Sequence, residues 1–190
     1  MKSEFKHFAS ELDAALALPG DVIELGVFHG DIFIPLAARA EEAGKLCIGI
    51  DSFVGFPNPH PVHDRTTDGL LHYDLGQFNA GGHPEAERIL ALCPPSATLI
   101  EGFVPDVLEQ IDPAIRFCFA HVDLDLYVPT LESLLWLWPR MSPGGIIALH
   151  DWFPDYRCLA SLAIRNFCHD KSLTVPPDSP VRYAFLTRPL

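Results

Sequence analysis

Apolar runs of strand length alternate along the chain with amphipathic segments. The apolar runs, which predict strands, are residues 21–27, 45–51, 97–102, 116–123, 144–151 and 181–188. The amphipathic segments, which predict helices, are residues 3–17, 30–43, 84–92, 104–111, 128–138 and 155–170. Most of the strands are continuously apolar, as expected when helices cover both faces of a parallel sheet. The pattern therefore predicts a single α/β domain over residues 1–190.

One segment, residues 52–83, interrupts this alternation. It contains prolines, glycines, histidines and aromatic residues without any sustained periodicity. Because it follows the carboxyl end of a predicted strand, where open α/β sheets bind ligands, we interpret it as a lid or substrate-recognition insert. The alternative is a variable surface loop. Its side chains that could contact a ligand are Phe53, Phe56, His60, His63, His72, Tyr73 and Phe78.

Charge and composition narrow the choice of partners. The chain has 25 acidic and 13 basic residues and a net charge of −12, which disfavours nucleic acid and favours a neutral or cationic small ligand. No apolar run approaches the roughly 18 to 20 residues that span a membrane, and the first residues lack the features of a signal peptide. The five cysteines are scattered, which is typical of free thiols. We therefore expect a cytoplasmic protein without a membrane partner.

The first candidate site is a glycine-containing turn after the first predicted strand. Glu24, Gly26 and Gly30 have the spacing E-x-G-x-x-x-G, which differs from the G-x-G-x-x-G of dinucleotide sites. Asp51 ends the second predicted strand, where an acidic residue can accept the hydroxyls of a ribose. These positions suit a nucleoside without phosphates. S-adenosylmethionine is such a ligand, and its positive charges would be favoured beside Glu24.

The second candidate site combines residues from two neighbouring strand ends. Asp123 and Asp125 follow the fourth predicted strand, and His150 and Asp151 follow the fifth. Because the carboxyl ends of parallel strands meet at one edge, these side chains should converge, and carboxylates at that density favour a bound divalent cation. The alternatives are that an aspartate caps the helix starting near Val128 and that His150 is merely structural.

These motifs resemble those of the metal-dependent O-methyltransferases typified by macrocin O-methyltransferase and the aminocoumarin-sugar methyltransferases. The resemblance covers most of the chain, and its motifs stand in the order of that family. The resemblance implies a Rossmann-like class I methyltransferase fold, with a mostly parallel seven-stranded sheet and an antiparallel C-terminal strand. The matching segments are GDVIELGVFHGD, GIDSFVGFP, IEGFVPDVL, VDLDLYVPTLESL and SPGGIIALHDW.

The resemblance also implies roles for individual residues. Asp123 and Asp151 match metal ligands, and Asp125 matches the proposed base that removes the proton of the acceptor hydroxyl. The positions that match S-adenosylmethionine contacts are Glu24, Gly26, Gly30, Asp51, Ser52, Gly102 and Phe103.

His150 departs from the family, which commonly has two adjacent acids at positions 150 and 151. The resemblance implies magnesium, but imidazole suits manganese, iron, cobalt, nickel or zinc better. Three roles stay open for His150: a ligand of a softer ion, a residue beside a water-filled position, or a second proton acceptor.

The sequence therefore predicts an S-adenosylmethionine-dependent O-methyltransferase that acts on a hydroxyl of a small molecule. By resemblance the acceptor is a sugar of a natural product or polysaccharide. The alternatives are a metal-dependent hydrolase that uses the Asp/His cluster and a non-catalytic nucleoside-binding protein. Trp136 and Trp138, on one apolar predicted helix, indicate core packing or the face of a homo-oligomer.

Overall fold

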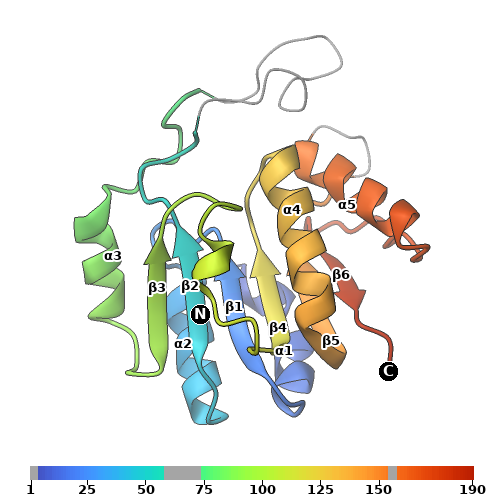
Figure 1. Cartoon of the computed structure of the whole chain (residues 1–190), viewed down its shortest axis with the longest axis horizontal. Coiled ribbons are helices and arrows are strands. Elements are labelled where there is room, and N and C mark those ends of the chain that lie inside the picture. Colours follow the sequence, from blue (N-terminus) through green and yellow to red (C-terminus); the bar gives the residue numbers. More distant parts are fainter. Residues whose placement is uncertain (1–3, 58–73, 154–157) are drawn as a thin grey trace.

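A computed structural model describes residues 4–57, 74–153 and 158–190, and its centre is a six-stranded sheet of order β3-β2-β1-β4-β5-β6 (Figure 1). The strands β1 to β5 are parallel, and β6 is antiparallel to β5. All six strands coincide with predicted segments, although β5 begins three residues before the predicted start at residue 144. Their bounds are β1 Asp21–Leu25, β2 Cys47–Asp51, β3 Ala97–Glu101, β4 Phe117–Val122, β5 Met141–Leu149 and β6 Ala184–Thr187.

The helices follow the predicted order with two differences. The predicted helix 3–17 is divided at Phe8, whose φ of −133° is not helical. The predicted helix 104–111 is wrong, since only one 3₁₀ turn forms there and the backbone is already extended at Ile111, whose ψ is 128°. The helices are η1 Phe5–His7, α1 Ala9–Leu16, α2 Phe33–Glu42, α3 His83–Leu90, η2 Leu108–Gln110, α4 Tyr127–Leu137, η3 Trp138–Arg140 and α5 Leu159–Asp170.

The prediction of seven strands is also wrong for the described residues, where β6 pairs directly with β5. The segment between α5 and β6 contains Pro176, Pro177 and Pro180. Proline has no backbone N–H to donate to a ladder, so this segment is a poor central strand. The mostly parallel α/β architecture with an antiparallel C-terminal strand is confirmed.

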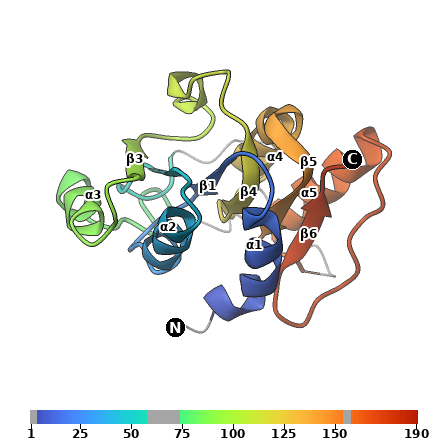
Figure 2. The same ribbon diagram turned by 90° about the horizontal axis from the view of Figure 1, so that it is seen from below.

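Helices cover opposite faces of the sheet (Figure 2), and an apolar core lies beneath each group of helices. Side chains of η1, α1, α2 and α3 build one core, and those of α4, α5 and η2 build the other. Because side chains alternate along a strand, Ile23 and Leu25 belong to the second core, whereas Val22 belongs to the first. Both faces are thus covered, which explains why the strands are continuously apolar.

The described parts of the insert form an ordered neck at the end of β2. The N–H of Phe56 donates to the carbonyl of Gln77 at 2.9 Å, and the carbonyl of Phe53 accepts the N–H of Gly82 at 2.8 Å. The side chain of Phe53 is completely buried, so it anchors the neck and does not face a ligand. Residues 58–73, with His60, His63, His72 and Tyr73, lie outside the described residues.

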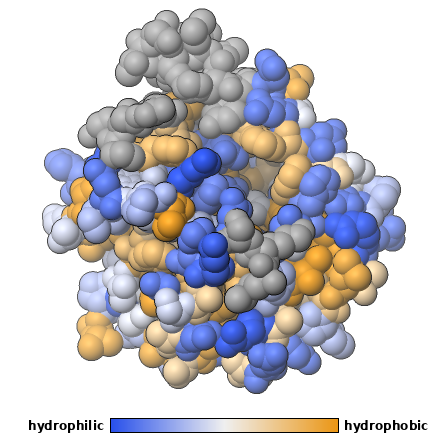
Figure 3. Space-filling model, turned by 180° about the vertical axis from the view of Figure 1, so that it is seen from behind, coloured by the Kyte–Doolittle hydropathy of each residue, from blue (hydrophilic) through white to orange (hydrophobic). Residues whose placement is uncertain are grey.

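No helix among the described residues is long and apolar enough to cross a membrane. Hydrophobic and hydrophilic residues are interspersed on the face seen in Figure 3.

The two tryptophans pack against the same core. Trp138 is only 8% exposed, and the guanidinium of Arg140 lies over the ring of Trp136, 4.2 Å from the ring centroid. The two tryptophans therefore contribute to core packing, as one of the two interpretations predicts.

Candidate active site

A cavity of about 250 Å³ opens at the carboxyl edge of the sheet, where the two candidate sites meet. Glu24 and Gly30 are predicted donor contacts that do not line it, and Asp151 lies beside it in contact with His150. The predicted site residues that line the cavity are Gly26, Asp51, Ser52, Gly102, Phe103, Asp123, Asp125 and His150.

The glycines of the first turn are required by packing within the protein. Gly26 has a φ of +92°, and a Cβ added there would lie 1.8 Å from the carbonyl oxygen of Asp123. Gly30 has a φ of +76°, and a Cβ there would meet the side chain of Ile89 at 3.0 Å. Both positions therefore need glycine for backbone conformation and close approach, and Gly26 joins the two candidate sites directly.

Asp51 holds two loops at the cavity. Its Oδ2 accepts the backbone N–H groups of Val27 and Phe28, each at 2.8 Å, and its Oδ1 accepts that of Phe53 at 2.7 Å. The carboxylate thus ties the turn after β1 and the neck of the insert to the end of β2. Oδ2 thus uses both of its lone pairs, whereas Oδ1 keeps one with which Asp51 can still accept a ribose hydroxyl.

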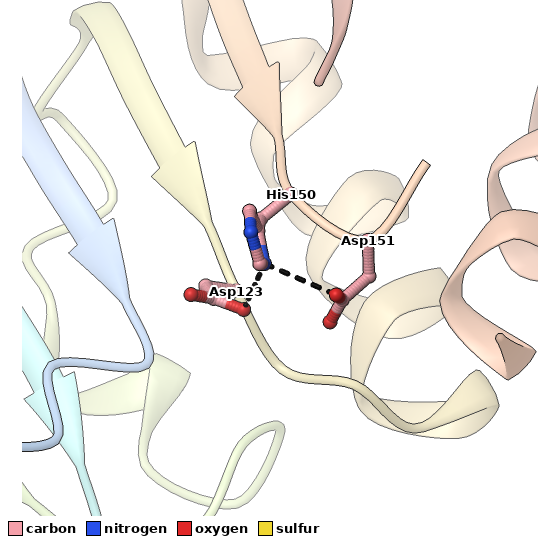
Figure 4. Close-up of side chains that lie close together, drawn as sticks. All are labelled: Asp123, His150 and Asp151. Atoms are coloured by element: carbon pink, nitrogen blue, oxygen red, sulfur yellow. Dashed lines mark hydrogen bonds and ion pairs between the residues drawn. The ribbon is translucent and has the colours of Figure 1, made fainter. Parts of the chain in front are cut away.

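Asp123, His150 and Asp151 converge as the sequence predicts (Figure 4). Nδ1 of His150 lies 3.0 Å from Oδ1 of Asp123 and 3.1 Å from Oδ1 of Asp151. Asp123 follows β4, and the other two follow β5, so the arrangement depends on the parallel register of these strands. The side chains are 30%, 13% and 10% exposed, respectively, which leaves the cluster reachable from the cavity.

The proximity of these groups perturbs their protonation. Burial lowers the pKa of His150, but hydrogen bonds and charge interactions with Asp123 and Asp151 outweigh it and raise that pKa to about 11. Burial, together with the charges of Asp151 and Asp123, raises the pKa of Asp125 to about 9. Without a bound cation, the His150 imidazolium offsets these carboxylates, and the charge of Arg182 adds to its effect on Asp151.

The cluster fits a divalent cation. One ligand atom from each of Asp123, His150 and Asp151 lies within 4.8 Å of the others. Oδ2 of Asp151 is buried and accepts no N–H group among the described residues, and the carboxyl of Asp151 lies close enough to that of Asp125 to share a proton that a cation would replace. Two carboxylates and one imidazole suit manganese and neighbouring divalent ions.

Two aspartates of this edge have unusual backbone conformations. Asp125 has a φ of 58° and Asp151 a φ of 57°, in the left-handed region that costs most residues about 1 to 3 kcal/mol. The alternative that an aspartate caps the following helix does not explain these conformations, because α4 begins after Leu126 without any side-chain cap. Backbone strain of this kind, beside a cavity, points to a functional constraint.

Three phenylalanines form an aromatic wall on the cavity, defined here as Phe28, Phe56 and Phe78. The ring of Phe78 meets those of Phe28 and Phe56 edge to face, with centroids 5.9 and 5.2 Å apart. Phe28 and Phe78 remain 41% and 46% exposed, although burying such rings is favourable. This exposure indicates a surface that contacts a ligand.

Sequence reasoning missed a buried polar chain beside this edge. Nδ1 of His121 is hydrogen-bonded to Oε1 of Glu24 at 2.8 Å, and its Nε2 to the hydroxyl of Tyr183 at 3.1 Å. Burial raises the pKa of Glu24 and lowers that of His121 to about 4, which favours an uncharged pair. The only available signal was a lone histidine inside the apolar strand β4.

Comparison with known proteins gives one family. A family model described as macrocin-O-methyltransferase (TylF) matches residues 4–179. A tetracenomycin-C rhamnosyl 4'-O-methyltransferase of Streptomyces olivaceus is 31% identical over 176 residues, which are 86% of this chain and 62% of that protein. The mycinamicin III 3''-O-methyltransferase of Micromonospora griseorubida is 28% identical over 71% of this chain and 56% of its own length. The chain thus spans less than two thirds of these relatives.

Solved structures agree on the fold. The O-methyltransferase NovP has a TM-score of 0.76 at 20% identity, over 98% of this chain and 79% of its own. The calicheamicin methyltransferase CalS11 has a TM-score of 0.71 at 22% identity, over 98% of this chain and 80% of its own. At these identities the likeness establishes the class I methyltransferase architecture alone.

Proposed function

Because the chain belongs to the macrocin-O-methyltransferase (TylF) family, we propose that it transfers a methyl group from S-adenosylmethionine to a hydroxyl of a small molecule. The observation that carries this proposal is one cavity that is shared by Gly26 and Asp51, from the predicted donor site, and by Asp123, Asp125 and His150. We also propose that residues 1–190 act as one methyltransferase domain, with the insert as the substrate-recognition element.

The donor site in this proposal lies along the ends of β1, β2 and β3. Asp51 would accept a ribose hydroxyl, while Ser52, Gly102 and Phe103 would contact the nucleoside from the ends of β2 and β3. Gly26 would present bare backbone to the methionine part. Glu24 and Gly30 keep a predicted role in the donor site, exerted from behind the cavity wall.

Asp123, Asp151 and His150 would hold the divalent ion, with manganese a better match than magnesium because of the imidazole. A bound cation would supply the charge that acidifies an acceptor hydroxyl and that favours ionised Asp125. The fit of the donor set supports this assignment, as does the buried Oδ2 of Asp151, which accepts no N–H group among the described residues.

Asp125 would act as the base. In this mechanism the acceptor oxygen attacks the methyl carbon, the carbon–sulfur bond breaks, and the hydroxyl proton passes to the carboxylate of Asp125. The left-handed backbone at Asp125 fixes this carboxyl on the cavity wall, two residues beyond Asp123. The turn at Gly26 holds the methyl donor in line, so positioning supplies part of the rate.

The acceptor in this proposal is a sugar hydroxyl. Two of the compared proteins carry rhamnose in their names, one as a tetracenomycin rhamnoside and one as TDP-rhamnose. The aromatic wall of Phe28, Phe56 and Phe78 offers rings on which the apolar face of a deoxysugar can stack. Acidic groups that line the same cavity would orient the hydroxyl.

Calorimetric titration with S-adenosylmethionine tests the proposal against both alternatives. We expect one site with a micromolar dissociation constant, and methyl transfer that EDTA abolishes and Mn²⁺ restores. A metal-dependent hydrolase would bind no S-adenosylmethionine. A non-catalytic nucleoside-binding protein would bind it and leave every acceptor unmethylated.

A further inference from the structure

The buried chain Glu24–His121–Tyr183 connects three segments that lie far apart in the sequence. Glu24 and His121 are register partners on adjacent strands β1 and β4, and Tyr183 immediately precedes β6. The three residues are 1%, 0% and 2% exposed. Burying such polar groups without partners is unfavourable, so the hydrogen bonds must persist for the chain to be tolerated.

Tyr183 is held firmly by its neighbours. Its ring stacks on Phe185 with centroids 6.3 Å apart and contacts Phe8 at 5.5 Å. Phe8 also stacks on His121 at 5.1 Å, so the anchor of the hydroxyl is itself enclosed. The hydrogen bond between the hydroxyl and Nε2 of His121 adds a directional contact to this packing.

Tyr183 also contacts the active-site cluster, through the ring of His150. The rings of Tyr183 and His150 are in edge-to-face contact, with centroids 5.1 Å apart and an interplanar angle of 62°. A half-turn of the His150 ring would exchange Nδ1 with a carbon and would lose its contacts with both Asp123 and Asp151. The second torsion of histidine is intrinsically loose, so a neighbour must restrict it.

We propose that Tyr183 is a positioning residue for His150: its hydroxyl, anchored by His121 and Glu24, fixes the ring that keeps Nδ1 of His150 directed at Asp123 and Asp151. The assignment of Nδ1 as a metal donor rests on the proposed function, whereas the orientation of the ring does not. Residues that orient a metal-binding histidine typically change metal affinity by about 10- to 100-fold when they are removed.

Tyr183→Phe tests this inference, because it deletes the hydroxyl and keeps the ring. The ring nitrogens are observed in long-range ¹H–¹⁵N spectra of histidine-labelled protein, and the signals of His150 are identified by their loss in His150→Asn. In the wild type, His150 should give one distinct pair of ring-nitrogen signals. Tyr183→Phe should shift or broaden that pair and weaken Mn²⁺ binding about tenfold. Phe185→Leu, which loosens the other face of Tyr183 but spares the hydroxyl, should change neither.

His121→Phe provides a second variant that removes the anchor from the other end, and it should disturb His150 in the same way. Wild-type ring nitrogens and wild-type Mn²⁺ affinity in a folded Tyr183→Phe protein would overturn the inference, as would an equal disturbance in Phe185→Leu. If the wild type binds no Mn²⁺, the proposed metal role fails, while the spectra still decide the role of Tyr183.

Discussion

The backbone of Gly26 lies against the carbonyl oxygen of Asp123, so closely that a Cβ at position 26 would be 1.8 Å from that oxygen. One contact therefore sets the distance between the turn proposed to hold the methyl donor and the strand end proposed to hold the metal. The obstructing atom is a backbone oxygen of Asp123, which follows β4. No side-chain rotation can therefore relieve the clash that a substitution of Gly26 would cause.

Gly26→Ala should reduce the free energy of unfolding by at least about 3 kcal/mol, since it combines a backbone clash with a strained φ. Gly44→Ala is the matched control, because Gly44 also has a positive φ, +69°, but no atom lies within 4 Å of its added Cβ. The control should lose only about 1 kcal/mol. Urea unfolding measures both, and equal losses would mean that the close approach is unimportant.

Asp125→Asn should reduce the turnover number by about a hundredfold or more, because an amide cannot accept the proton. The substitution keeps the shape of the side chain, so the affinity for S-adenosylhomocysteine, measured by calorimetry, should stay within about twofold of the wild type. Full activity of the variant would assign the base elsewhere, with His150 the next candidate.

His150→Asp restores the two adjacent acids that are common in the family. It replaces an imidazole with an oxygen donor, which magnesium prefers, so the ratio of Mn²⁺ to Mg²⁺ affinity should fall. Calorimetric titrations with each ion measure this ratio. His169→Asp, at a side chain on α5 that is 89% exposed, is the control and should leave the ratio unchanged. An unchanged ratio in His150→Asp would remove His150 from the ligand set.

Glu24 gives the stability of the protein a pH dependence of defined sign. Burial, followed by the charges of Asp123 and Asp51, raises its pKa well above 4.5. The folded state therefore holds a proton that the unfolded state releases above pH 4.5, and this stabilisation is lost as the pH rises toward the folded pKa. Each pH unit in that window changes the free energy of unfolding by at most about 1.4 kcal/mol.

Glu24→Gln removes this proton, so its stability relative to the wild type should rise between pH 4.5 and pH 7.5. Urea titrations at several pH values measure the difference, and Glu109→Gln, at an exposed side chain of η2, is the matched control substitution. A difference that stays constant over this range would mean that the folded Glu24–His121 pair holds no such proton, which would contradict the raised pKa of Glu24.

The sequence predicted the acidic cluster well because parallel strands bring their carboxyl ends to one edge. Asp123, His150 and Asp151 needed only correct strand assignments to be placed together. The chain through His121 and Tyr183 could not be found in this way, since its members are 62 and 97 positions apart and no local pattern marks them. Their pairing depends on the order of β1, β4, β5 and β6 in the sheet.

The geometry of the proposed donor site was predicted less completely. Asp51 was correctly expected at the end of β2, but its bonds to Val27, Phe28 and Phe53 depend on how two loops fold over it. The E-x-G-x-x-x-G pattern could not distinguish a glycine that faces a ligand from one that packs on Ile89, as Gly30 does. The seventh strand was expected by resemblance, although the prolines before β6 already argued against it.

Mass spectrometry of methyl transfer tests the central claim most directly. The protein is incubated with trideuteromethyl S-adenosylmethionine, Mn²⁺ and a panel of rhamnosides, with Asp125→Asn run in parallel. The account predicts a labelled methyl group on a sugar oxygen, formed by the wild type and nearly absent with Asp125→Asn. Cleavage of the glycosides without label, or equal labelling by both proteins, would contradict it.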